Sequence, residues 1–160
     1  VEDCAGVCGG GAEEDMCGVC GGDNSDCAAP ELFVFEQSTQ QAFYYFQTAS
    51  IEGILLATGD WVGAFNGDVC VGARAWDTAL CGGGVCDVPV NGYDANFPEE
   101  TAGYMLPGDI PIFKIYDVSN RLIYTATPDI EYQWIETHIF GTNPLIDLVA
   151  DISSAAPCEE

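Results

Sequence analysis

Residues 60–75 read DWVGAFNGDVCVGARA and carry the strongest local signal for the fold of this chain. Asn66 and Gly67 lie in the middle of the stretch, between two runs rich in β-branched, aromatic and small residues. Asn-Gly between strand-like runs is the best short-range mark of a β-hairpin, because both residues tolerate the left-handed backbone of a tight turn. The stretch therefore predicts two antiparallel strands, at 60–65 and 69–75.

Strand-like runs continue on both sides of this hairpin, and no amphipathic stretch of three helical turns interrupts them. Aromatic runs follow a boundary at Pro30, and the remaining predicted strands cover 110–117, 120–127, 130–136 and 145–152. About seven to nine short strands separated by turns predict an all-β fold. We expect a two-sheet antiparallel β-sandwich over 31–152, with a flattened barrel as the alternative.

The segment in front of the sandwich has a different character. Residues 3–27 read DCAGVCGGGAEEDMCGVCGGDNSDC, and the unit GVCGG at 6–10 recurs at 18–22. The segment has almost no apolar residues, so it lacks a hydrophobic term to offset an ordering entropy of roughly 1 to 2 kcal/mol per residue. We therefore expect residues 1–30 to form a small, loop-rich stalk held by disulfides or cations.

The nine cysteines suit either disulfides or zinc. Only Cys17 and Cys20 form a CxxC pair, whereas a four-cysteine zinc site usually brings two, so disulfides and an oxidising location are preferred. The cysteines expected in disulfides are Cys4, Cys8, Cys17, Cys20, Cys27, Cys81 and Cys86. If Cys81 and Cys86 pair across their glycine turn, seven cysteines remain, and an odd number cannot all pair within one chain. Cys70 is the candidate for a buried thiol, and Cys158, in the polar tail 153–160, is the candidate for a bond to another copy.

Oxygen-bearing side chains in the cysteine segment predict a calcium site, because calcium takes six to eight hard oxygen ligands. The expected ligands are Asp15, Asp23, Asn24 and Asp26. A second site is considered in a long loop predicted from Asp87 to Gly108, with Asp94 and Glu99 in the loop and Asp109 just after it. The spacing is not that of an EF-hand loop, and solvated turn acids remain the alternative at both places.

The net charge of the chain limits the kinds of partner that it can bind. The chain has 26 acidic and three basic residues and a formal net charge of −23. Such a chain repels nucleic acid and anionic membrane surfaces, and no apolar run is long enough to insert into a bilayer. Cations in the medium are expected to relieve its self-repulsion.

The cysteine segment also resembles known sequences. CGVCGGDNSDC at 17–27 resembles a motif of secreted thrombospondin-motif metalloproteases and the tandem cysteine repeats of large secreted or surface proteins of marine bacteria. Residues 59–76 and 103–117 are similar to a β-rich module of such bacterial proteins. The resemblance implies an extracellular setting and a spacer role. It does not imply protease activity, because the chain has no HExxH and His138 is its only histidine.

No catalytic constellation is present in the sequence, so we expect no enzyme. The first functional hypothesis is an extracellular structural or adhesive module, stabilised by calcium and joined head to tail to copies of itself. The second is a carbohydrate-binding accessory module of a secreted enzyme. For the second, Trp76 at a strand end is the candidate glycan contact, while Trp61 and Trp134 are expected in the core.

Overall fold

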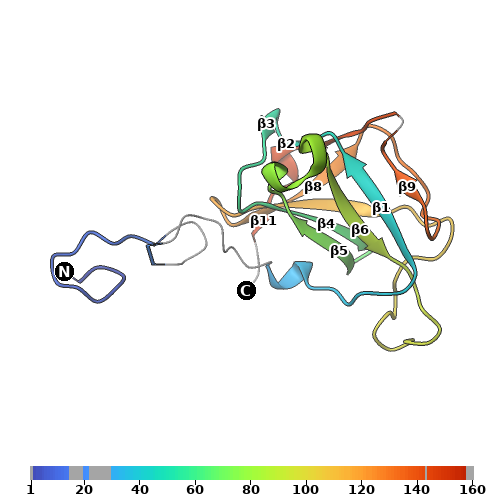
Figure 1. The fold of residues 1–160 in the computed structure, drawn as a ribbon, viewed down its shortest axis with the longest axis horizontal. Helices are drawn as coiled ribbons and strands as arrows, with labels where there is room; N and C mark the ends of the chain where they lie inside the picture. The colour runs from blue at the N-terminus through green and yellow to red at the C-terminus, as the bar shows by residue number, and fades with distance from the viewer. Residues whose placement is uncertain (1, 15–19, 22–29, 143, 158–160) are drawn as a thin grey trace.

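The computed structural model describes residues 2–14, 20–21, 30–142 and 144–157 (Figure 1). The fold is all-β, with two sheets packed against each other as the sequence predicts. The described residues of the cysteine segment belong to neither sheet and contain two isolated β-bridges.

The larger sheet has the strand order β3-β2-β10-β8-β7-β4-β5, and β11 also pairs with β8. Its strands are β2 Thr48–Ile51, β3 Ile54–Leu55, β4 Trp61–Asn66, β5 Val69–Ala75, β7 Ile112–Asp117, β8 Leu122–Pro128, β10 Asp147–Ala150 and β11 Ala156–Pro157. The smaller sheet has the order β6-β1-β9 and consists of β1 Gln41–Phe46, β6 Cys86–Asn91 and β9 Ile139–Phe140.

Single 3-10 turns connect several strands. They are η1 Glu31–Phe33, η2 Thr78–Leu80, η3 Gly82–Gly84 and η4 Ile152–Ser154. Within the described part of the chain, no helix has the length and apolar character needed to cross a membrane.

Two segments run next to each other as they pass from the smaller sheet to the larger sheet. β1 continues into β2 and β9 continues towards β10, so that β1 pairs in parallel with β9 and β2 with β10. At the crossing, the backbone N–H of Gln47 donates to the carbonyl oxygen of Ile146 at 2.8 Å. The other strand pairs among the described residues are antiparallel. The predicted two-sheet antiparallel sandwich is therefore confirmed, with these two parallel pairs as exceptions that join segments far apart in the sequence.

The hairpin predicted at Asn66-Gly67 is present. β4 and β5 pair antiparallel with Asn66 opposite Val69, which leaves Gly67 and Asp68 as the two-residue loop. Gly67 has a φ of 61°, the left-handed conformation that a tight hairpin turn requires at its first central position. The local turn chemistry therefore decided this pairing.

Two other predictions need correction. Residues 130–136 form no strand, because the backbone of Trp134 bonds to the loop: its N–H donates to Asp109 and its carbonyl accepts from Gly108. The loop predicted from Asp87 also starts too early, since β6 runs to Asn91 and pairs with β1. Burial thus alternates along residues 130–134, but they pair with no strand. Residues 87–91, expected at the start of a loop, belong to a strand.

Aromatic side chains join the two sheets at the centre of the core. Phe113 of β7 packs against Tyr44 and Phe46 of β1, with ring centroids 5.5 and 5.0 Å apart. A second, smaller cluster covers the other face of the larger sheet, where Phe33 of η1 packs against Phe65, Cys70 and Ile123. Residues 30–35 therefore tie the start of the sandwich onto its larger sheet.

The backbones of the two sheets approach each other closely at Gly72 of β5. A Cβ atom there would lie 1.5 Å from the carbonyl oxygen of Pro89 in β6. Next to it, the Asn91 side-chain amide donates to the carbonyl oxygen of Val71 at 2.7 Å. Only glycine permits this contact.

We predict that Gly72→Ala lowers the free energy of unfolding by at least about 3 kcal/mol, because the backbone of β5 or β6 must move. Gly82→Ala is the matched control, since a Cβ atom there meets nothing within 4 Å and its φ is ordinary. Urea denaturation followed by tryptophan fluorescence measures both. Equal stability of the two variants would contradict the prediction.

Candidate functional site in the amino-terminal cysteine loops

The sequence repeat in the cysteine segment is also a structural repeat. Glu2 forms an antiparallel bridge with Cys8, and Glu14 forms the same bridge with Cys20, twelve residues further on. None of the described residues in 2–14 and 20–21 is buried. We call the described residues of these two loops, 2–14 and 20–21, the cysteine loops; hydrogen bonds and a disulfide shape them rather than a hydrophobic core.

A disulfide between Cys4 and Cys20 joins the two cysteine loops, with a Cα–Cα distance of 5.6 Å. Cys8 was expected in a disulfide, but it is a free and exposed thiol. The physical reason is that Cys4, its nearest cysteine in the sequence, turns to the second loop instead. Cys17, Cys27 and Cys158 lie outside the described residues.

Asp3 organises the first cysteine loop. Its Oδ1 accepts hydrogen bonds from the backbone N–H groups of Ala5 and Val7 at 3.0 and 2.9 Å, and its Oδ2 accepts from Ala12 at 3.2 Å. Chiefly through the Val7 N–H, these bonds lower the pKa of the Asp3 carboxyl below its usual value. The bonds therefore stabilise the loop above the ordinary Asp range and are lost as the pH falls through the lowered pKa. Sequence reasoning missed this residue, although Asp is a typical turn residue whose side chain bonds to the backbone two residues on.

Gly10 makes room for the Asp3 carboxylate. A Cβ atom on Gly10 would lie 2.0 Å from Asp3 Oδ2. At least one glycine of the GVCGG unit is thus required for packing.

The expected calcium ligands Asp15, Asp23, Asn24 and Asp26 lie outside the described residues. The second expected set does not converge: Asp94 is buried and bonded to Thr39, Asp109 accepts from Leu106 N–H at 2.9 Å, and Glu99 is exposed. Across 2–14, 20–21, 30–142 and 144–157, no three His, Cys, Asp or Glu side chains are grouped to hold a metal ion. Asp94 and Asp109 instead accept hydrogen bonds from the backbone N–H groups of Asn96 and Leu106.

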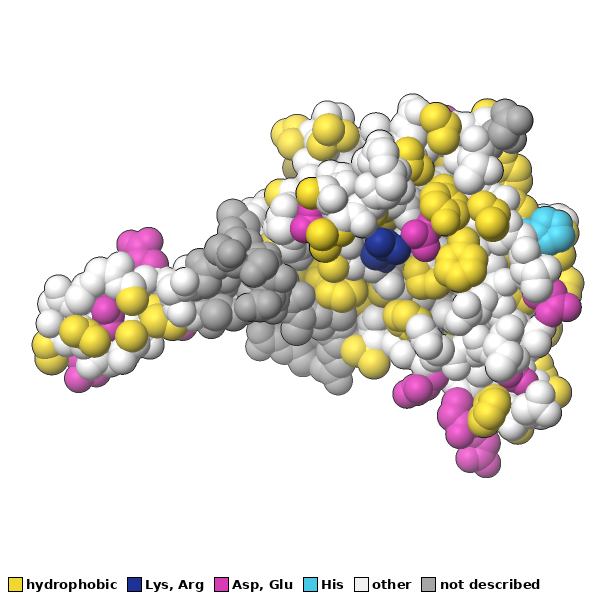
Figure 2. Space-filling model, viewed as in Figure 1, with side chains coloured by type: hydrophobic (Ala, Val, Ile, Leu, Met, Phe, Trp, Pro, Cys, Tyr) yellow, Lys and Arg dark blue, Asp and Glu magenta, His cyan; other side chains and the backbone are white. Residues whose placement is uncertain are grey.

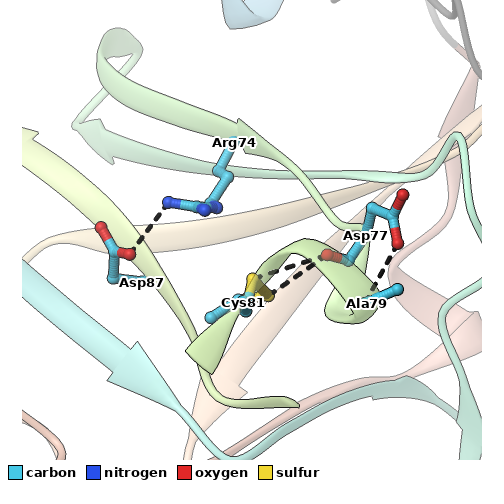
Figure 3. Close-up of a disulfide and its surroundings, with 6 residues drawn as sticks. Arg74, Asp77, Ala79, Cys81 and Asp87 are labelled. Carbon is cyan, nitrogen blue, oxygen red and sulfur yellow. Dashed lines mark hydrogen bonds and ion pairs between the residues drawn. A yellow bond between two sulfur atoms is a disulfide. The ribbon is translucent and has the colours of Figure 1, made fainter. Parts of the chain in front are cut away.

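The local disulfide expected between Cys81 and Cys86 is present, with a Cα–Cα distance of 5.2 Å (Figure 3). Gly83 and Gly84 between the cysteines have φ values of 64° and 76°, which a side chain would disfavour. Beside this turn, Arg74 Nη1 donates to Asp87 Oδ1 at 2.9 Å. The disulfide and the ion pair hold the start of β6 against the end of β5.

Cys70 is a buried free thiol, as its apolar neighbours in the sequence predict. Burial raises the pKa of the Cys70 thiol to about 11. At neutral pH the group is therefore protonated and acts as a small apolar side chain of the outer cluster.

The tryptophans are placed differently from the glycan-binding prediction. Trp76 is only 3% exposed and packs against Phe46 in the core, so it offers no face to a sugar. The local sequence could not reveal this, because Trp76 lies just past β5 where the sheets meet. Trp134 is buried as expected and donates its indole N–H to Val90, whereas Trp61 is partly exposed at the outer cluster.

A different set of rings stacks near the surface. Phe140 of β9 lies between Tyr132 and His138, with centroid distances of 5.1 and 5.7 Å and interplanar angles of 25° and 22°. His138 is exposed, and the other two rings are partly exposed. Sequence reasoning missed this stack because its rings come together only when the segment 130–140 folds along β1.

Comparisons with protein-family models, with curated proteins and with solved structures found no match. Function is therefore inferred from the chemistry of this chain alone.

We predict that iodoacetamide at pH 8 modifies Cys8 in the folded protein and leaves Cys70 unmodified. Cys8 is exposed, whereas Cys70 is buried and, with a pKa of about 11, carries the reactive thiolate in roughly one molecule in a thousand. Peptide mass spectrometry measures both sites, and the same reaction in urea is the control that should expose Cys70. Equal labelling of the two thiols in the folded state would contradict the prediction.

Proposed function

We propose that this protein is an extracellular structural or adhesive module without catalytic activity. The observation that carries the proposal is the pair of repeated cysteine loops, which are cross-linked by Cys4–Cys20 and have no buried residue among those that the structure describes. A segment that depends on a disulfide for its shape suits an oxidising compartment. In this proposal the loops are a connector and the sandwich is the folded unit that they present.

Calcium is the proposed stabiliser of the connector. Seven acids and no base lie between Val1 and Cys27, and the whole chain carries a net charge of −23. Asp15, Asp23, Asn24 and Asp26 remain the proposed ligands, because carboxylate and amide oxygens are those that calcium prefers. Bound calcium also relieves repulsion between acids that are crowded on a short segment.

Self-association through sulfur is the proposed mode of assembly. Cys8 offers an exposed thiol on the first cysteine loop, and Cys158 belongs to the polar tail at the other end of the chain. A bond between Cys158 of one copy and Cys8 of the next joins unlike ends, and such contacts extend into open polymers. Joining the two thiols releases two protons and passes two electrons to an oxidising disulfide, which such compartments supply.

Carbohydrate binding is the second candidate function. It now rests on the stack of Tyr132, Phe140 and His138, because Trp76 is buried. Aromatic rings near the surface can stack on the apolar faces of sugar rings. A protein that binds glycans and remains a monomer would favour this candidate over the polymer.

Non-reducing electrophoresis of the protein after mild oxidation tests the polymer. We expect a ladder of multimers that collapses with a reductant and disappears in Cys8→Ser and in Cys158→Ser. Cys70→Ser is the control and should keep the ladder, since that thiol is buried. A single monomer band for the unaltered protein, or a ladder that persists in both Cys8→Ser and Cys158→Ser, would reject the head-to-tail bond.

Hydrogen exchange with and without a calcium chelator tests the metal. We expect faster exchange after chelation in peptides from the first 27 residues and no change in peptides from β1 to β10, because the sandwich has its own core. Addition of magnesium instead of calcium is the control and should not restore protection, since it demands a stricter geometry. Identical exchange in the two conditions would count against calcium.

A further inference from the structure

A groove of about 340 Å³ opens beside the β2–β3 hairpin. We call it the hairpin groove. Its walls come from β3, from the loop 56–60 that precedes β4, from the β7–β8 turn and from η4. It lies in the sandwich, away from the cysteine loops, and it plays no part in the function proposed above. Its size is within the range of pockets that bind small ligands or side chains.

Large apolar side chains surround the hairpin groove and remain exposed. Ile54 and Leu55 of β3 are 75% and 65% exposed, and Ile152 of η4 is 61% exposed. Hydrophobic side chains are visible at this corner of the domain in Figure 2, where Figure 1 places β3. Several such side chains around one hollow mark a binding surface more than scattered ones do.

The groove also lies at a free sheet edge. β3 ends the larger sheet on this side, beyond β2. An edge strand presents backbone groups that another extended chain can pair with. An extended peptide therefore fits the site better than a globular surface.

The turn between β2 and β3 has a backbone conformation that costs free energy. Glu52 and Gly53 both have a left-handed backbone, with φ values of 51° and 81°. For Glu52 this costs roughly 1 to 2 kcal/mol. Its carboxylate accepts a hydrogen bond from the backbone N–H of Ile152 at 3.1 Å, which ties the hairpin to η4. The groove is thus preformed, with a carboxylate at its rim.

The acidic and basic side chains among the described lining residues of the groove are carboxylic acids only; burial raises the pKa of Asp60, so Glu52 and Asp117 are the two that the proposal uses. Glu52, Asp60 and Asp117 are among its lining residues, and none of the described lining residues is Lys, Arg or His. Burial acts to raise the pKa of Asp117, but hydrogen bonds from Ser119 and Asn120 outweigh it and hold this pKa below its usual value. Asp117 therefore stays ionised at neutral pH.

A second copy of the chain is a poor occupant. It would bring 26 acids and only three bases to an acidic site. Two of those bases are already engaged, since Arg74 pairs with Asp87 and Lys114 lies 4.7 Å from the centroid of the Phe65 ring. Charge complementarity instead requires a cationic partner.

We propose that the hairpin groove binds an extended segment of a partner protein in which Lys or Arg alternates with apolar residues. The apolar side chains pack against Ile54, Leu55 and Ile152, and the cationic groups lie at the carboxylates of Glu52 and Asp117. The backbone of the segment runs along β3. This inference goes beyond the proposed function and does not depend on it.

Fluorescence anisotropy with a labelled nine-residue peptide that alternates valine and lysine tests the proposal on the full chain, in about 150 mM salt to screen long-range attraction. A peptide with serine in place of valine keeps the charge, and one with glutamate in place of lysine keeps the apolar surface. We expect the valine–lysine peptide to bind roughly tenfold more tightly than either control, because the site needs both features. Backbone NMR shifts should change at residues 51–57.

Matched variants locate the binding. Leu55→Ser and Glu52→Gln should each weaken it by about fivefold or more, and Gln retains an oxygen for the Ile152 N–H. Leu80→Ser and Glu99→Gln remove an exposed leucine and an exposed carboxylate outside the groove and should change the affinity by less than about twofold. Circular dichroism checks that all four variants fold.

Three results would overturn the proposal. The first is no binding of the valine–lysine peptide, and the second is equal binding of the serine peptide, which would indicate attraction to net charge alone. The third is equal weakening by Glu99→Gln and Glu52→Gln, which would place the peptide elsewhere. The polymer and calcium experiments use other residues, so their failure leaves this result unchanged.

Discussion

The contact of Phe113 with Tyr44 and Phe46 is the interaction on which the sandwich depends. These rings come from both sheets and meet at centroid distances of 5.5 and 5.0 Å. Around them the core buries Trp76, Trp134 and the apolar sides of β4, β5 and β6. Burial of such aromatic surface is the dominant favourable term in folding a domain of this size. The position of every surface feature, including the hairpin groove and the stack at Phe140, follows from how the two sheets meet.

The cysteine loops, unlike the sandwich, are not stabilised by a hydrophobic core. Their described residues, 2–14 and 20–21, are not buried, and the contacts that hold them are those of the Asp3 carboxylate, the glycine that accommodates it and the Cys4–Cys20 disulfide. One chain therefore combines a part stabilised by the exclusion of water with a part stabilised by bonds and charges. The second part depends on the Cys4–Cys20 disulfide and on the ionised Asp3 carboxylate, whereas the first part has a buried core in addition to its Cys81–Cys86 disulfide. This division is the physical basis for treating the loops as a connector.

The excess of acidic residues affects both the sandwich and the cysteine segment. Arg74 and Lys114 are used within the sandwich, by Asp87 and by the ring of Phe65, so they do little to offset the acids at the surface. The excess of acids favours cations around the whole molecule, both as small ions and as basic groups of partners. The same imbalance makes contact between like surfaces of two copies costly.

Features with a local cause were predictable from the sequence. The hairpin at Asn66-Gly67 follows from the turn, the Cys81–Cys86 disulfide follows from the glycines between the cysteines, and the buried state of Cys70 follows from its apolar neighbours. The strand prediction for 130–136 is wrong, because burial alternates there over 130–134 as in a strand while the backbone of Trp134 bonds to a loop. Trp76 misleads because its position past the end of β5 resembles an exposed strand terminus.

The sequence by itself determined the class of fold, the division into cysteine segment and sandwich, and the acidic character of the surface, because these depend on composition, periodicity and turn residues. Only the tertiary structure decided that β1 and β9 run in parallel, that Cys4 bonds to Cys20 and leaves Cys8 free, and which apolar side chains stay exposed at β3. Each of these depends on contacts between residues distant in the chain. Such contacts leave no local pattern, since the free energy that selects them is gained only when both partners are already in place.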